Sequence, residues 1–221
     1  MSGLRLAPSA PRRAFRVLCL GAHADDIEIG CGATLLRLRR LGARVHFHWV
    51  VWSATGVRAA EAGRSQRRLL GARVRASLDL HGFRDGFFPS EYAGVKEAFE
   101  RLARRFQPDL VLTHHRADRH QDHRVVSDLT WNTFRRHHVL EYEVPKWDGD
   151  LGQPNLYVPL SAGDARRKVR HLLAVFSSQR AKDWFTESTF LALMRLRGLE
   201  CRAPSGYAEA FHAAKSVLVL R

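Results

Sequence analysis

Two short segments of the chain concentrate side chains that could hold a metal ion. The segments are "GAHADDIEIGCGATLL" (residues 21–36) and "RADRHQDHR" (116–124), and the residues concerned are His23, Asp25, Asp26, Asp118, His120, Asp122 and His123. A catalytic zinc ion needs three protein ligands drawn from histidine and carboxylate, with a fourth position open to water. Each segment holds a pair of such residues three positions apart, which can project to one side of a turn. The pattern therefore predicts a hydrolytic metal site.

Each of these two clusters follows a predicted β-strand. The apolar runs at 16–22 and 109–115 are typical of buried parallel strands, and each cluster begins where its run ends. In parallel sheets, ligands bind beyond the carboxyl ends of the strands. We therefore expect the two clusters to meet at one edge of one sheet.

Strand-like and helix-like segments alternate along the remaining sequence. Further strands are expected at 44–53, 139–145 and 215–220. Helices are expected at 31–42, 59–78, 90–106, 122–136, 164–179 and 188–198, and a loop at 146–157. This alternation predicts an α/β sandwich with a mostly parallel sheet. Residues 1–15 are basic and lack an apolar stretch, so we interpret them as a flexible lead-in to a single domain at 16–221.

The chain of 221 residues carries a formal charge of +14. Such a charge attracts nucleic acid, phosphorylated ligands and anionic surfaces. The basic residues are spread over several predicted helices and no nucleic-acid-binding motif is present, so no specific nucleic-acid partner is expected. The charge leaves two interpretations open: a general preference for surface arginine, or an anionic small-molecule substrate.

The apolar runs, the N-terminus and the cysteine spacing indicate the cellular compartment of the protein. The longest apolar runs fall far short of the ~20 residues that a membrane span needs, and the N-terminus lacks the apolar region of a secretory signal. Cys19, Cys31 and Cys201 show no spacing typical of a disulfide framework or a cysteine zinc site. The sequence therefore predicts a cytoplasmic protein, and it leaves the oligomeric state open, including a homo-oligomer.

Several of these residues have purely structural alternatives. Asp26 could cap the helix that follows it, and His114 and His115 could be polar residues at the mouth of a strand. The run "GCGATL" (30–35) lacks the full GxGxxG spacing of a dinucleotide site. Close packing of the helix against the first strand explains its small residues better.

Taken together, the two clusters resemble the motifs of the PIG-L/LmbE-type zinc-dependent N-deacetylases. The first segment is similar to that family's AHPDDxExGxGGTL signature, and "HHRADRHQDHRVV" (114–126) is similar to its HxxDxHxDHxxV motif. "SGYAEAF" (205–211) resembles a third segment near the family's C-terminus. Ala24 replaces the usual proline, and the acidic residue after the paired aspartates lies one place later, at Glu28. The resemblance implies a Rossmann-like three-layer sandwich with the metal site at the carboxyl ends of its strands.

The resemblance also implies roles for the clustered residues. His23, Asp26 and His123 would be the zinc ligands, with Fe²⁺ or another divalent ion as a substitute. Asp25 would be the general base for hydrolysis of an N-acetyl group. His120 would be a cationic group that stabilises the developing oxyanion.

Residues around the ligands receive less specific roles from the resemblance. Asp122 would orient a neighbouring residue from outside the metal's ligand shell, and Asp118 would be structural. Arg58 and Asp85 would contact the substrate, and Glu61 would brace Arg58.

Three functional hypotheses follow for the whole chain. The first is a zinc-dependent N-deacetylase acting on an N-acetylated amino sugar or its conjugate, with the charge favouring an anionic conjugate. The second keeps the chemistry and changes the substrate to a non-sugar amide from natural-product synthesis. The third, from a different class, is a basic nucleic-acid-associated protein in which the His/Asp clusters are incidental.

Overall fold

The apolar run before the first cluster forms β1 (Phe15–His23), an interior strand of a seven-stranded sheet. The structure is a computed structural model that describes residues 14–217. The other strands are β2 (Val45–Ser53), β3 (Arg75–Leu80), β4 (Leu110–His114), β5 (His138–Tyr142), β6 (Leu156–Pro159) and β7 (Ala208–His212). Their order across the sheet is β3-β2-β1-β4-β5-β7-β6. β1 to β5 pair in parallel, and β7 is antiparallel to both of its neighbours.

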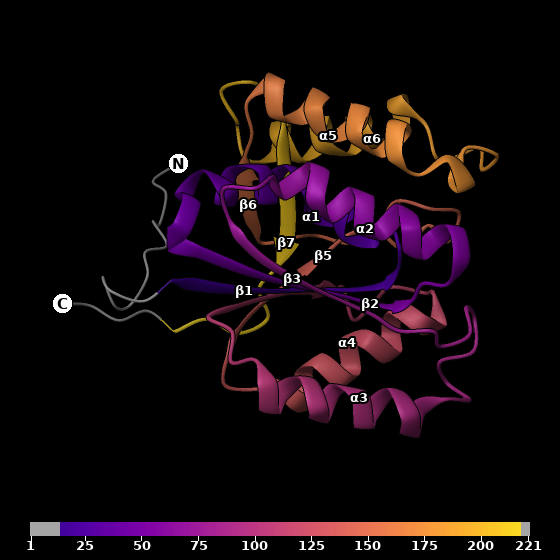
Figure 1. The fold of residues 1–221 in the computed structure, drawn as a ribbon. Helices are drawn as coiled ribbons and strands as arrows, with labels where there is room; N and C mark the ends of the chain where they lie inside the picture. Colours follow the sequence, from indigo (N-terminus) through magenta and orange to yellow (C-terminus); the bar gives the residue numbers. More distant parts are fainter. Residues whose placement is uncertain (1–13, 218–221) are drawn as a thin grey trace.

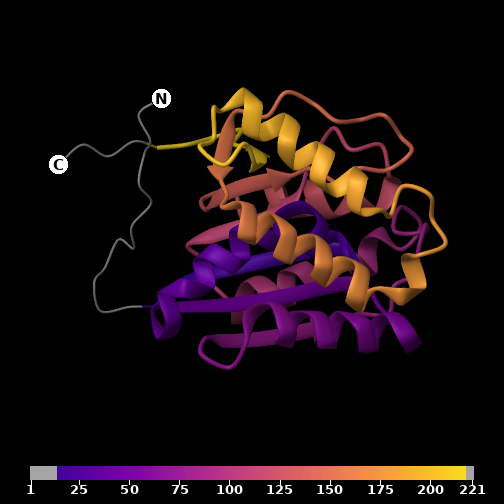
Figure 2. The same cartoon turned by 90° about the horizontal axis from the view of Figure 1, so that it is seen from above.

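Helices cover both faces of this sheet (Figure 1). One layer contains α1 (Asp26–Leu38), α2 (Gly56–Leu70), α5 (Ala162–Val175) and α6 (Glu187–Glu200). The opposite layer contains α3 (Tyr92–Arg105) and α4 (Gln121–Thr133). Seen from above, the four helices of the first layer lie side by side (Figure 2). The predicted α/β three-layer sandwich with a mostly parallel sheet is thereby confirmed.

The two helical layers explain why the central strands β1 and β4 are mostly apolar and buried. Successive side chains of a strand point to opposite faces. In β1, Val17 and Cys19 pack into the core beneath α1 and its neighbours, whereas Leu18 and Leu20 pack into the core against α3 and α4. Among the residues that the structure describes, no helix is both long and apolar enough to cross a membrane.

The strand order places a topological switch point between β1 and β4. From β1 the chain moves outward to β2 and β3, and it then returns to place β4 on the other side of β1. In open α/β sheets, ligands bind in the crevice at such a point. The two His/Asp clusters follow β1 and β4, so the fold brings both of them to this crevice.

Of the two glycines after the first cluster, Gly30 is a close-packing residue and Gly32 is not. A Cβ atom on Gly30 would lie 2.1 Å from Cδ2 of Tyr142 on β5. The missing side chain at Gly30 therefore leaves room for the Tyr142 ring, while α1 packs against β1 as expected. The helix also begins at Asp26, earlier than the expected start at residue 31.

The structure corrects three of the predicted elements. The helix expected at 59–78 ends at Leu70, because Gly71 adopts a positive φ of 72° there, and 75–80 forms β3. The loop expected at 146–157 gives way to β6 at Leu156.

The third correction concerns the chain ends. The final strand expected at 215–220 is not formed at 215–217, and its remainder lies outside the described residues. The last strand is instead β7, which bridges β5 and β6. Of the expected lead-in, residues 1–13 also lie outside the described residues, and β1 already includes Phe15.

Candidate active site

The first half of the candidate site is built by the turn from β1 into α1. His23 ends β1, Asp25 is the N-cap residue of α1, and Asp26 is the first residue of the helix. Oδ2 of Asp26 accepts a hydrogen bond from the backbone N–H of His23 at 2.6 Å. Asp25 makes no side-chain capping bond. The simple capping alternative therefore does not explain either carboxylate.

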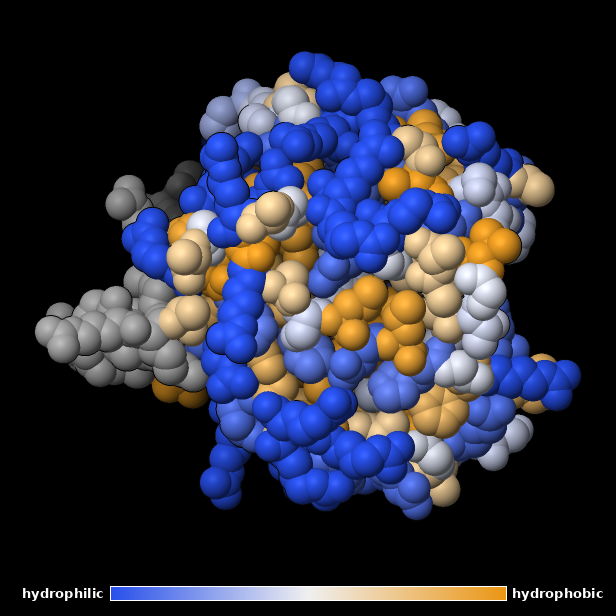
Figure 3. Space-filling model, in the orientation of Figure 1, coloured by the Kyte–Doolittle hydropathy of each residue, from blue (hydrophilic) through white to orange (hydrophobic). Residues whose placement is uncertain are grey.

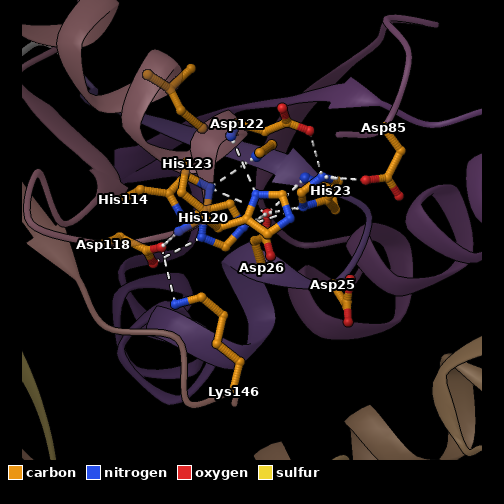
Figure 4. Close-up of polar contacts among 12 residues, drawn as sticks. His23, Asp25, Asp26, Asp85, His114, Asp118, His120, Asp122, His123 and Lys146 are labelled. Atoms are coloured by element: carbon orange, nitrogen blue, oxygen red, sulfur yellow. Dashed lines mark hydrogen bonds and ion pairs between the residues drawn. The ribbon is translucent and has the colours of Figure 1, made fainter. Parts of the chain in front are cut away.

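The second half comes from the first turn of α4. The three atoms expected to bind a metal are Nδ1 of His23, Oδ2 of Asp26 and Nε2 of His123 (Figure 4). The two nitrogens are 3.3 Å apart, and they lie 3.4 Å and 3.5 Å from the oxygen. In a tetrahedral site with bonds of about 2.1 Å, ligand atoms are separated by about 3.4 Å. The three side chains thus fit one metal ion.

Two carboxylates contact the ring nitrogens of His23 and His123 that are not expected to bind the metal. Oδ2 of Asp122 lies 3.2 Å from Nε2 of His23, and Oδ2 of Asp118 lies 2.9 Å from Nδ1 of His123. Carboxylates in such positions fix the tautomer and the orientation of a metal-binding histidine. Asp122 lies where the predicted orienting role requires it. Asp118, expected to be only structural, contacts His123 directly.

Neighbouring charges and burial shift the pKa values of Asp26 and of the histidines around it in different directions. Burial alone would raise the pKa of Asp26, but His123, His114 and His23 lower it well below its usual value. Burial and the neighbouring His114 lower the pKa of His123 to about 3. An ionised carboxylate and a neutral imidazole are the forms that bind metals. Burial would lower the pKa of His23, but Asp26 and Asp122 raise it well above its usual value, so metal binding there would displace a proton.

Asp25 lies beside this cluster and not within it (Figure 4). Its Oδ1 pairs with Nη2 of Arg58 at 3.1 Å. Burial and the charge of Asp26 raise the pKa of Asp25, although Arg58 lowers it. A buried carboxylate with a raised pKa is suited to proton transfer near neutral pH.

The predicted substrate residues border the same region. Asp85 lies between His23 and Arg58, with oxygens 3.1 Å from Nε2 of His23 and 3.6 Å from Nη1 of Arg58. Glu61 and Arg58, both in the described part of the chain, interact through charge and share no hydrogen bond. The carboxylate of Glu61 instead accepts hydrogen bonds from Ser177 and Ser178, which follow α5.

His120 is half-buried at the mouth of the cluster. Its ring centroid lies 4.9 Å from that of His23 and 4.6 Å from that of His123. Nδ1 accepts the backbone N–H of Asp122 at 3.3 Å, which leaves the ring proton on Nε2. Burial and the proximity of His23 lower the pKa of His120. These features favour a neutral N–H donor over the expected cationic one.

Two residues of the site were not anticipated. His114 is fully buried, its Nε2 lies 3.2 Å from Oδ2 of Asp26, and its ring stacks on that of His123 at 3.9 Å. Lys146, just after β5, places Nζ 3.0 Å from Oδ1 of Asp118. The position of His114 at the end of the strand next to β1 was the available signal. For Lys146, a lone lysine in a predicted loop, the sequence offers none.

Residues 18–134, which span both His/Asp clusters, match the family model described as PIG-L: GlcNAc-PI de-N-acetylase. The chain belongs to this family of deacetylases. It is 31% identical over 139 residues to the uncharacterized deacetylase YaiS of Escherichia coli K12, and this alignment covers 58% of the chain and 74% of YaiS.

Solved structures share the fold over most of the chain. The N,N'-diacetylchitobiose deacetylase of Pyrococcus horikoshii has a TM-score of 0.67 at 20% identity, covering 90% of this chain and 83% of that one. GalB, the 4-carboxy-2-hydroxymuconate hydratase of Pseudomonas putida KT2440, has a TM-score of 0.72 at 15% identity, covering 94% and 99%. Because one fold carries both activities, the reaction must be argued from the site.

Proposed function

We propose that this protein is a zinc-dependent N-deacetylase that hydrolyses the N-acetyl group of an amino sugar or its conjugate. The observation that carries the proposal is the triangle formed by His23, Asp26 and His123. Its edges of 3.3, 3.4 and 3.5 Å suit a tetrahedral ion, and it lies at the switch point of the sheet. Membership of a deacetylase family supports the reaction class.

These three residues would hold the ion, and Fe²⁺ could replace zinc with the same ligand set. When bound, such an ion lowers the pKa of a water ligand toward ~7 and polarises a carbonyl oxygen. Asp122 and Asp118 contact one ring nitrogen of His23 and His123, respectively, and thereby keep the other nitrogen of each ring directed at Asp26.

The remaining steps belong to residues of the chain. The Asp25 carboxylate accepts a proton from the attacking water and passes it to the leaving amine. Arg58 pairs with Oδ1 of Asp25 and thereby keeps that carboxylate on one side of the site. Nε2–H of His120 donates a hydrogen bond to the developing oxyanion, and one such donor contributes about 3 kcal/mol in comparable sites.

An exposed tryptophan that follows Lys146 in the chain supports a sugar conjugate as the substrate. Trp147 is 67% exposed and follows Lys146, which contacts the site through Asp118. Its Nε1–H donates to Asp183 at 2.8 Å, and its ring meets Trp184 edge-on at 6.0 Å. The electronegative face of an indole ring attracts the weakly positive C–H groups of a sugar ring. The tryptophan pair is therefore suited to a second ring beyond the reacting acetamide.

The experiment that tests the proposal combines metal analysis with acetate release. The purified protein is expected to hold about one zinc ion per chain, to lose activity on chelation, and to regain it with zinc. The panel contains N-acetylhexosamines, their neutral and phosphorylated conjugates, and non-sugar acetamides. Preference for phosphorylated conjugates that weakens with salt would support an anionic substrate.

Two variants separate binding from catalysis. Asp25→Asn should lose activity and keep its zinc, whereas His123→Ala should lose both. Asp128→Asn, which removes an exposed carboxylate of α4, is the matched control and should leave both unchanged. Full activity of Asp25→Asn, or full zinc occupancy of His123→Ala, would contradict these roles. Steeply salt-dependent nucleic-acid binding without bound metal would favour the non-catalytic alternative instead.

A further inference from the structure

A charged cavity lies in the helical layer of α1, α2 and α5, away from the candidate active site. Its volume is about 210 Å³, and it is lined by Leu36, Arg68, Leu69, Arg167, Arg170 and His171. On α2, roughly three helical turns, or about 15 Å, separate Arg68 from Arg58. Hydrophilic side chains cover much of this layer on the surface (Figure 3).

The three cavity arginines, Arg68, Arg167 and Arg170, come from two helices and surround one hollow. Among the residues that the structure describes, none of their guanidinium groups has a carboxylate partner or a hydrogen bond. Arg40 and Arg58, in contrast, each pair with a buried aspartate. Arg68, Arg167 and Arg170 are exposed, and guanidinium groups gathered in this way repel one another, so a bound anion would reduce the repulsion.

His171 forms the buried wall of the cavity, and only 5% of it is exposed. Its Nε2 lies 2.7 Å from Oγ of Ser65, which donates its own proton to Glu28. Nδ1 of His171 has no hydrogen-bond partner among the described residues. Burial and the charges of Arg68 and Arg167 lower the pKa of His171 to about 4. Next to an anion, this ring could take up a proton and donate from Nδ1.

We propose that this cavity binds one phosphoryl group, either as free phosphate or on a small molecule. Guanidinium groups match phosphate oxygens with paired hydrogen bonds and bind them more strongly than neutral donors do. Leu36 and Leu69 exclude water from part of the cavity, which strengthens these interactions. An apolar cavity of about 150 Å³ already holds benzene, so the volume here is sufficient for a phosphoryl group with a small carrier.

Calorimetric titration of the zinc-loaded protein with inorganic phosphate, at constant ionic strength in chloride, tests this proposal. We expect one saturable site that weakens about tenfold or more in Arg68→Gln/Arg167→Gln. The matched control is Arg64→Gln/Arg166→Gln, which removes the same charge from the same two helices at positions that are exposed like Arg68 and Arg167 but lie outside the cavity. The control should change affinity by less than about twofold. A parallel titration with glucose 6-phosphate shows whether a carrier improves binding over free phosphate.

A second readout follows the His171 ring by NMR. Saturating phosphate should raise its pKa in the wild type and in the control, but not in the cavity variant. Thermal unfolding first establishes that both double variants are folded. Equal loss of phosphate binding in the two variants, or unchanged binding in the cavity variant, would overturn the proposal, because the anion would then bind diffusely or at the active site. Phosphate binding that leaves the His171 signals unmoved would overturn it as well.

Discussion

Replacement of Asp118 by asparagine tests how the metal-binding histidines are held. Oδ2 of Asp118 accepts from Nδ1 of His123 at 2.9 Å. Oδ1 accepts from the backbone N–H of His120 at 2.8 Å and lies 3.0 Å from Nζ of Lys146. All three partners are hydrogen-bond donors, so both side-chain oxygens of residue 118 must act as acceptors. Asparagine offers an acceptor on one side and a donor on the other.

The orientation of the asparagine amide decides which of the hydrogen bonds of Asp118 is lost. If the NH₂ group faced Lys146, it would oppose a buried ammonium and a backbone N–H together. We therefore expect the amide oxygen to face these donors and the NH₂ group to face His123. Nδ1 of His123 must then accept, and the ring proton moves to Nε2, the atom that lies 3.5 Å from Asp26. Loss of such an orienting partner costs 10–100-fold in metal affinity, or about 1.4–2.7 kcal/mol.

Zinc affinity, measured by competition with a chromophoric chelator, gives the result directly. We expect Asp118→Asn to bind zinc about 10–100-fold more weakly than the wild type. Asp148→Asn is the matched control, because Asp148 also lies near Lys146, at 3.6 Å, but its side chain is 40% exposed. The control should stay within about twofold of the wild type. A folded Asp118→Asn variant with wild-type zinc affinity would refute the argument that this carboxylate sets the tautomer of His123.

Three further predictions concern packing, substrate and pH. Gly30→Ala should lower the free energy of unfolding, measured in urea, by about 1–3 kcal/mol, because its Cβ would overlap the Tyr142 ring. The control Gly32→Ala should leave the stability unchanged, because its Cβ meets nothing closer than 3.6 Å. Trp147→Ala should lower kcat/KM for a disaccharide conjugate about tenfold and leave free N-acetylhexosamine unchanged in acetate-release assays; equal losses on both would contradict its role. Because the pKa of His171 is lowered to about 4 in the folded protein, the unfolded chain binds a proton more readily. The contribution of neutral His171 to the free energy of unfolding, up to about 3 kcal/mol, is therefore present above pH 6.5 and is lost as pH falls toward 4. His171→Gln should flatten that part of the stability profile in urea unfolding between pH 7 and pH 4.5, and an unchanged slope would contradict it.

The convergence of the two clusters was predictable because parallel strands end at a common edge. His23 and His123 are far apart in sequence, but each follows a strand, and the neighbouring pairing of β1 and β4 brings them together. The role of His114 was not predictable in the same way. A polar residue at a strand end can face solvent or the site, and only the position of Asp26 beside β4 decides between the two.

The missed strands have a different cause. β3 is an edge strand with exposed and half-buried side chains, so it lacks the apolar signature that marked β1, β2 and β4. Arginines before it continue the helical pattern of α2, and Gly71 gave the only local stop signal. β6 and β7 are fixed by antiparallel pairing between segments about 50 residues apart, which no local period reports. Their absence from the prediction left the site intact, because neither strand carries a residue of the cluster.

The adjacent carboxylates Asp25 and Asp26 show how one turn can give two chemical roles. The turn into α1 directs Asp26 toward His23, His114 and His123, and these histidines keep it ionised despite burial. It directs Asp25 to the other side, where burial and the negative charge of Asp26 raise its pKa. The ionised state of Asp26 therefore raises the proton affinity of Asp25 and makes it a stronger base. A ligand and a base follow from this coupling, because each role needs the protonation behaviour that the neighbouring residue helps to impose.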